Sequence, residues 1–89
     1  MTVRSTEIPV AKEESLHLRP MQVLNEQALV FESKVTLSRG GKLADVKSIL
    51  ELMLLAAETG PLFLEAEGTD ADEAVQALAD LLTRELSKE

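Results

Sequence analysis

His17 is the only histidine of this 89-residue chain, and it stands two residues before Arg19 and three before Pro20. A neutral imidazole nitrogen is a nucleophile, and a guanidinium is a permanently charged, planar donor that matches phosphate oxygens. Proline suits the first turn of a helix, where its missing N–H would have no partner anyway. The spacing therefore predicts that His17 lies at the opening of a helix, with a guanidinium close to it.

That position favours a chemical role for a histidine that would otherwise be incidental. The unpaired amides at a helix N-terminus bind anions, and each favourable contact contributes roughly 0.3–1 kcal/mol. The same field disfavours an imidazolium, so the ring is expected to be neutral and nucleophilic near pH 7. A nucleophile, a helix terminus and a guanidinium together are what phosphorylation of an imidazole requires.

Other chemistries lack the residues they need. The chain has no cysteine and no second histidine, so neither a disulfide framework, a thiolate metal site nor a histidine metal pair is expected. Gly40-Gly41 is better explained as a turn than as a phosphate-binding loop. The carboxylates at 13–14 and 70–73 are better explained as solvated or helix-capping groups than as an acid–base pair. We expect no metal and no cofactor.

The composition limits the partners. A formal net charge of -7 and only two aromatic residues argue against nucleic acid, which needs clustered basic residues and stacking surfaces. The longest apolar run, 52–57, is too short to cross a bilayer, and the first five residues lack the apolar stretch of a signal peptide. A cytoplasmic protein with no membrane contact is therefore expected.

Four segments have the alternation of strands, at 3–10, 35–38, 42–45 and 62–67. Pro9 cannot donate to a sheet, so the first strand is expected at an edge or to end in a bulge. Leu62, Leu64 and Ala66 are expected on one face of the last strand. Between the second and third strands, 39–42 contains the glycine pair of a tight hairpin.

Three segments have the periodicity of helices. The first follows His17 and has apolar residues at helical spacing, Met21, Leu24, Ala28 and Phe31. The second begins with a capping box in which Glu51 closes back on Ser48, and 59–61 ends it. Its apolar stripe is Ile49, Leu52, Met53 and Ala56. The third starts at the acidic segment 70–73 and carries a wide stripe: Ala71, Ala74, Val75, Leu78, Leu81 and Leu82.

The order strand, helix, strand, strand, helix, strand, helix predicts an α+β fold. Three helices are expected on one face of a four-stranded, mostly antiparallel sheet. At 89 residues the chain has room for one domain, so a single domain spanning 1–89 is expected.

Two motifs resemble a known family. Leu16-His17-Leu18-Arg19-Pro20 resembles the phosphohistidine signature of HPr, the histidine-containing phosphocarrier of the phosphoenolpyruvate-dependent phosphotransferase system, whose usual form is Gly-aliphatic-His-Ala-Arg-Pro. Segment 46–53 resembles the family's second signature, around a regulatory serine. The hairpin between them and the segments 65–68 and 72–74 fall where HPr has them, so the resemblance covers nearly the whole chain.

The resemblance implies the open-faced β-sandwich of HPr and a relay. In the family, phosphoenolpyruvate phosphorylates enzyme I, which passes the phosphoryl group to Nδ1 of the histidine, and the carrier delivers it to an enzyme IIA domain. His17 would be the acceptor and Arg19 would stabilise the phosphoryl group. The protein would then be a stoichiometric phosphoryl carrier and not an enzyme, and the family default is a monomer.

Ser48 has two interpretations. As the N-cap of the second helix it would contribute about 1 kcal/mol to stability. By resemblance it would be the target of an HPr kinase/phosphorylase that regulates carbon use, with a transcriptional regulator as a further partner. A phosphate there would sit at a helix N-terminus, where negative charge is tolerated or stabilising.

The chain departs from the family pattern at several positions. Ser15 replaces a glycine, Leu18 replaces a small residue and Glu51 replaces a glycine. The first helix offers Gln22, Glu26 and Leu29 where typical carriers present hydroxyl or lysine side chains to an acidic enzyme I. Like charges at an interface reduce affinity and on-rate, so altered partners are expected. Docking would then use an apolar patch formed by Leu18, Val23, Ile49, Leu50 and Leu54.

Two alternatives to sugar transport stay open at this point. In the first, the chain is a regulatory protein of the same fold, in which phosphorylation of Ser48 controls docking and His17 is not used. In the second, it is a carrier of the nitrogen-related branch of the phosphotransferase system, which acts on regulators.

Overall fold

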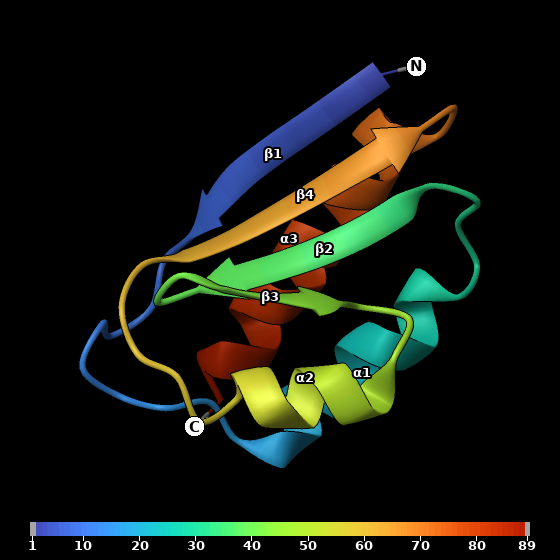
Figure 1. Ribbon diagram of the computed structural model, residues 1–89. Coiled ribbons are helices and arrows are strands. Elements are labelled where there is room, and N and C mark those ends of the chain that lie inside the picture. The colour runs from blue at the N-terminus through green and yellow to red at the C-terminus, as the bar shows by residue number, and fades with distance from the viewer. Residues whose placement is uncertain (1, 89) are drawn as a thin grey trace.

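The computed structural model describes residues 2–88 as two layers, a sheet and a set of helices (Figure 1). Met1 and Glu89, the ends of the predicted 1–89 domain, lie outside the described residues. The elements follow in the order β1 (Thr2–Ile8), α1 (Leu18–Ala28), β2 (Lys34–Arg39), β3 (Lys42–Asp45), α2 (Ile49–Leu55), β4 (Leu62–Gly68) and α3 (Ala71–Leu86).

The four strands form one antiparallel sheet with the order β1-β4-β2-β3. All three helices cover the same face of this sheet, and the other face is open (Figure 1). The predicted fold class, an α+β open-faced sandwich, is therefore confirmed. No helix within residues 2–88 has the length and apolar character needed to span a bilayer.

Alternation decides which strand residues face the helices. Leu62, Leu64 and Ala66 of β4 are fully buried and their neighbours in sequence are exposed, as predicted. Leu37 of β2 lies opposite Leu64 in the sheet and is also buried. The core between the layers consists of these side chains, Ile8 of β1, Val46 before α2 and the inward faces of the helices, chiefly Met21, Leu24, Leu52, Leu78 and Leu82.

The turn between β2 and β3 needs glycine for two reasons. Gly40 and Gly41 have φ angles of +59° and +80°, which side-chain-bearing residues rarely adopt. A Cβ atom on Gly40 would also lie 2.7 Å from the carbonyl oxygen of Thr59. The hairpin tip therefore packs closely on the connection between α2 and β4.

Two predicted boundaries were wrong by a few residues. β1 ends at Ile8, so Pro9 follows the strand, although β1 does lie at an edge as expected. α1 ends at Ala28, so Phe31 packs against the core from a loop and not from the helix. The loop turns early because the Asp70 carboxylate, at the N-terminus of α3, accepts hydrogen bonds from chain segments 32–33 and directs them into β2.

Asp70 is tied to this loop by three donors. The amides of Glu32 and Ser33 donate to its two carboxylate oxygens at 2.8 and 2.9 Å, and the Ser33 hydroxyl donates to Oδ1 of the same group. These hydrogen bonds hold the pKa of the Asp70 carboxyl below its ordinary value, and the bond from the Ser33 hydroxyl has the largest effect. This carboxylate serves the fold, far along α3 from His17.

α2 buries a different face from the one predicted. Leu52 is buried as expected, but Leu55 is its buried companion, while Ile49 and Met53 are exposed and Ala56 is half-buried. The helix has only seven residues, and its buried side must meet both β3 and α1. Leu52 and Leu55 lie on one face of the helix, which packs against these neighbours, and Ile49 and Met53 are left at the surface.

Candidate functional site

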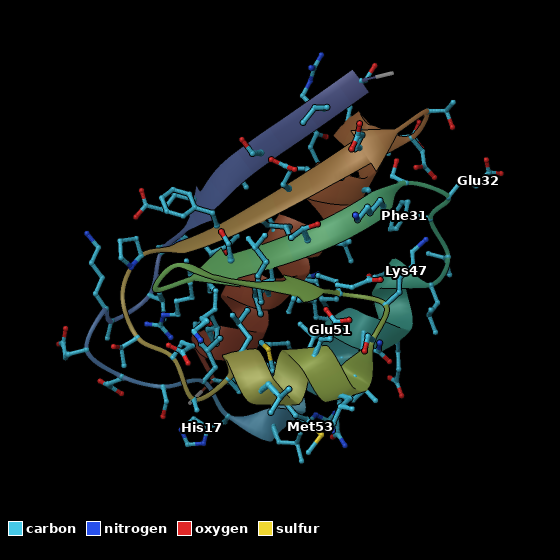
Figure 2. The ribbon with its side chains drawn as sticks, viewed as in Figure 1. His17, Phe31, Glu32, Lys47, Glu51 and Met53 are labelled. Atoms are coloured by element: carbon cyan, nitrogen blue, oxygen red, sulfur yellow. The ribbon has the colours of Figure 1, made fainter. Side chains whose placement is uncertain are left out.

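His17 is the N-cap residue of α1. Its backbone is extended (φ -85°, ψ 157°), its side chain is exposed, and it does not cap the helix with a side-chain hydrogen bond. The helix begins at Leu18, so the predicted place of His17 at the helix opening is confirmed. Figure 2 shows the ring at the edge of the molecule farthest from the sheet.

The first turn of α1 offers hydrogen-bond donors beside this ring. The amides of Leu18 and Arg19 have no acceptor within the helix, because the first turn of any α-helix lacks the preceding carbonyls. Pro20 is the third residue of the helix and brings no amide hydrogen. The Arg19 guanidinium is exposed, and no hydrogen bond or ion pair joins it to another residue in the range 2–88. The two residues that follow His17 thus offer two amides and a guanidinium as donors.

The loop that leads to His17, residues 9–17, has no regular structure but is bonded to its surroundings. The Leu16 amide donates to the Ala56 carbonyl at 2.8 Å, and the Gly60 amide donates to the Lys12 carbonyl at 2.6 Å. Leu16 itself is buried in the core. The connection between α2 and β4 therefore supports the backbone on the N-terminal side of His17.

Arg39 is the charged residue that the sequence interpretation missed. It is 1% exposed and donates from Nη2 to the Ala11 carbonyl at 2.9 Å and from Nε to the Gly60 carbonyl at 2.7 Å. Burial lowers the pKa of this guanidinium. The signal that could have found it is the alternation of β2, which directs Val35, Leu37 and then Arg39 inward.

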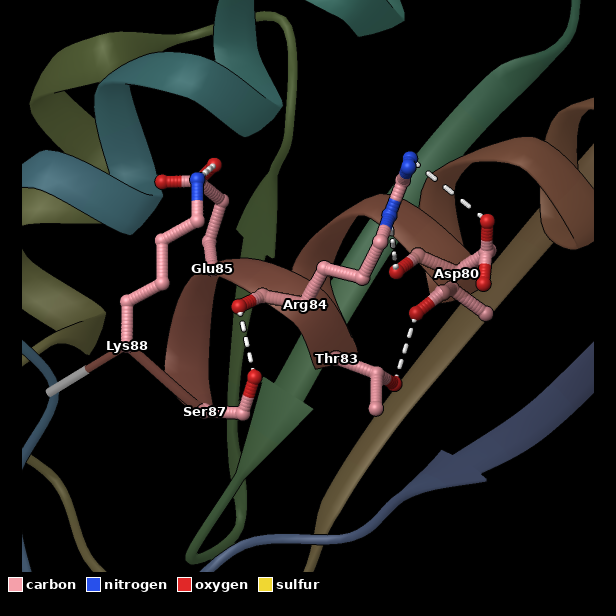
Figure 3. A network of polar contacts seen from close by, with 7 residues as sticks. Asp80, Thr83, Arg84, Glu85, Ser87 and Lys88 are labelled. Atoms are coloured by element: carbon pink, nitrogen blue, oxygen red, sulfur yellow. Dashed lines mark hydrogen bonds and ion pairs between the residues drawn. The ribbon is translucent and has the colours of Figure 1, made fainter.

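A surface hollow of about 470 Å³ lies on one side of His17, between the loop and the last turns of α3. Its α3 wall includes Thr83, Leu86 and Ser87. The hydroxyl of Thr83 donates to the Ala79 carbonyl at 2.7 Å, and that of Ser87 donates to the Arg84 carbonyl at 2.8 Å (Figure 3). Because both hydroxyl protons already bind carbonyls of α3, the Thr83 and Ser87 oxygens can only accept hydrogen bonds from a group in the hollow. The two hydroxyls of the α3 wall therefore do not serve as donors to an anion near His17.

On the α2 side, the predicted apolar patch is at the surface. Leu18, Ile49, Leu50 and Leu54 are exposed, and Val23 is half-buried. Met53, which we did not predict there, is exposed too and lies with His17 at the same edge of the molecule in Figure 2. We call these six residues the apolar patch. Ser15 and Glu26, two of the departures from the family pattern, are also exposed.

Ser48 caps α2, but the predicted box is only half correct. The Ser48 hydroxyl accepts from the Glu51 amide at 3.3 Å, as expected. The Glu51 carboxylate, however, accepts from the Asp45 amide at 2.8 Å, while the Ser48 amide donates to the Asp45 carbonyl at 2.9 Å. The turn before α2 already satisfies the Ser48 amide, so the carboxylate reaches the next free amide upstream. The Glu51 carboxylate therefore lies in the same turn of the chain as the Ser48 hydroxyl.

The fold and this site define a class of protein: a small open-faced sandwich with an exposed histidine at the N-terminus of its first helix. Residues 4–84 match the family model described as the PTS HPr component phosphorylation site, where PTS denotes the phosphotransferase system. The chain belongs to the HPr family of phosphocarrier proteins in that system.

Known relatives agree with this assignment. The phosphocarrier protein HPr of Mycoplasma capricolum is 41% identical over 64 residues, which are 71% of this chain and 72% of that protein. The crystal structure of HPr from Bacillus anthracis aligns with a TM-score of 0.76 at 30% identity, covering 91% of this chain and 98% of the other. Crh of Bacillus subtilis, a catabolite repression protein whose crystal structure is described as a swapped dimer, aligns with a TM-score of 0.69 at 35% identity, covering 91% and 94%.

Proposed function

We propose that this chain is a cytoplasmic, single-domain, monomeric phosphoryl carrier. It accepts a phosphoryl group on Nδ1 of His17 from phosphorylated enzyme I and delivers it to an enzyme IIA domain. The observation that supports this most strongly is the exposed His17 at the N-cap of α1, beside the first-turn amides and Arg19.

Phosphoryl transfer needs a nucleophilic nitrogen and groups that stabilise the charge of the phosphoryl oxygens. The Nδ1 lone pair attacks phosphorus as the bond between phosphorus and the donor breaks, and the same exchange runs in reverse when the acceptor's nucleophile attacks. The oxidation state of phosphorus does not change, so the step needs no oxidant or reductant. The phosphoryl oxygens carry the negative charge, and the Leu18 and Arg19 amides with the Arg19 guanidinium are the groups that stabilise it.

Docking is assigned to the apolar patch. Its side chains come from the first turns of α1 and from the outer side of α2, so a partner seated on them lies next to His17. Isolated exposed apolar residues are normal, but five exposed ones on two adjacent helices are typical of an interaction site. We propose that enzyme I and enzyme IIA domains use the same patch in turn, since both must reach the same nitrogen.

The test is incubation with phosphoenolpyruvate and an enzyme I, followed by mass spectrometry. We expect the mass to rise by one phosphoryl group that acid removes. The Ser48→Ala variant should gain it equally, and the His17→Ala variant should not. Absence of the label in the wild-type protein, or its persistence in His17→Ala, would overturn the proposal.

Regulation through Ser48 is the second candidate, favoured by the likeness to Crh. In this hypothesis an HPr kinase/phosphorylase modifies the Ser48 hydroxyl, and the product binds a transcriptional regulator. The Glu51 carboxylate in the same turn opposes a second negative charge there. Incubation with ATP and an HPr kinase separates the two functions, because it should label the wild type and not Ser48→Ala.

The branch of the phosphotransferase system depends on the acceptor. A phosphorylated sample offered to enzyme IIA domains of the sugar and nitrogen branches should lose its label faster to one of them. Preference for a sugar-branch domain would support a transport role, and preference for a nitrogen-branch domain would support control of regulators.

A further inference from the structure

The most unusual side chain of the described core is Arg39. It ends β2, points toward the helix layer and is the only charged residue among the buried ones of 2–88. No carboxylate pairs with it in an ion pair within that range, and its Nη1 atom is buried with no hydrogen-bond partner. Burying an unpaired charge is unfavourable, and positions where a local rule is broken concentrate at functional sites.

The two bonds that Arg39 does make join three separate segments. Nη2 reaches the Ala11 carbonyl in the loop before His17, and Nε reaches the Gly60 carbonyl between α2 and β4. Gly60 in turn donates its amide to Lys12, the next residue of that loop. The guanidinium therefore links the loop to the end of β2. It also binds Gly60, which makes a second hydrogen bond to the same loop.

The position of His17 depends on both of its flanks. On the C-terminal side, α1 sets the direction of its amides. On the N-terminal side, the chain from Pro9 to Leu16 has no strand or helix, so its hydrogen bonds and the buried Leu16 are what restrain it. A displacement of about 1 Å at a reacting group can reduce a rate by roughly 100-fold.

We propose that Arg39 is a positioning residue: by holding the Ala11 and Gly60 carbonyls, it keeps the His17 ring in register with the first-turn amides of α1 for phosphoryl transfer. This inference rests on the proposed function. It extends that function to a residue that lies in the core and does not touch the phosphoryl group.

Three variants test it. Arg39→Met retains most of the apolar stem and removes every donor, and Arg39→Lys retains a charged donor that can reach the same carbonyls. Val35→Ala is the matched control, because Val35 is fully buried in the same strand but at its other end. Should Arg39→Met not fold, Arg39→Gln, which keeps a single amide donor group, takes its place under the same criteria.

The first readout is phosphorylation by enzyme I at a fixed temperature, with thermal melting of each variant. For Arg39→Met we expect kcat to fall at least tenfold with KM within twofold of wild type, because the apolar patch is untouched. Arg39→Lys should recover most of kcat. Val35→Ala should lower the melting temperature and leave kcat within twofold.

The second readout needs no partner protein. Phosphoramidate, a small phosphoryl donor, transfers its phosphoryl group to imidazole nitrogen with release of ammonia, and its rate of labelling at His17 should fall in Arg39→Met and recover in Arg39→Lys. If enzyme I fails to label the wild type, the relay is wrong, and this readout still tests Arg39. A loss in Arg39→Met no larger than in Val35→Ala, or no recovery in Arg39→Lys, would overturn the positioning role.

Discussion

Leu50→Ala removes most of a side chain of the apolar patch that is 66% exposed on α2. Complete burial of a leucine contributes about 1.5–3 kcal/mol, so the exposed two-thirds that a partner can cover corresponds to roughly 1–2 kcal/mol. Since 1.4 kcal/mol is a factor of ten, Leu50→Ala should raise the Kd for enzyme I about 5- to 30-fold. The kcat of phosphorylation should stay near the wild-type value.

The assay is a calorimetric titration of the unphosphorylated carrier into enzyme I, with KM measured in parallel. Val3→Ala is the control, because Val3 is an apolar residue that is 47% exposed on β1, at the sheet edge opposite β3, the strand that α2 contacts. Both substitutions are at the surface, so the free energy of unfolding should change by less than about 0.5 kcal/mol. If Val3→Ala weakens binding as much as Leu50→Ala does, the patch is not the docking site.

Four further predictions concern stability and regulation. Ser48→Ala should lower the free energy of unfolding by about 1 kcal/mol in urea titrations, and an unchanged midpoint would contradict the cap. Glu51→Gln should speed modification of Ser48 by ATP and an HPr kinase, whereas equal rates would show that the carboxylate does not oppose it. The pKa of Asp70 in the folded protein lies below its ordinary value, so ionisation of this carboxyl stabilises the fold above about pH 4. That stabilisation is lost as the pH falls through the lower pKa of the folded state. The difference in melting temperature between wild type and Asp70→Asn should therefore shrink in acid, and a pH-independent difference would refute this. Gly40→Ala should destabilise the protein more than Gly41→Ala, because a Cβ at Gly40 meets a backbone oxygen at 2.7 Å and one at Gly41 meets nothing within 4 Å; equal losses in thermal melts would contradict the close packing.

The features that the sequence predicted correctly are those set by local rules. Alternation placed Leu62, Leu64 and Ala66 on the buried face, and the glycine pair produced the positive φ angles of the hairpin. Pro20 located the first turn of α1, and with it the place of His17. Each of these depends on neighbours within a few residues, so the sequence alone contains the information.

The features that were missed depend on contacts distant in sequence. α1 ends three residues before Phe31 because Asp70, some forty residues away, holds the following loop. The Glu51 carboxylate bonds to Asp45 because the turn before α2 had already satisfied the Ser48 amide. The sequence places Arg39 in a hairpin, because a charged residue at the end of a strand is usually solvated. Its burial could not be predicted locally, because its two carbonyl acceptors come from other segments of the chain.

For the proposed relay, one small surface has to serve two partners and release both. Apolar contacts are non-directional, so a patch of leucine, isoleucine, valine and methionine side chains can meet two different partner surfaces. Its modest area favours short-lived complexes, which a carrier needs because most differences in affinity appear in the rate of dissociation. The charge of -7 and the exposed Glu26 on α1 disfavour an acidic partner. The partners that fit best are therefore apolar at the centre of their contact surface and neutral or basic at its rim.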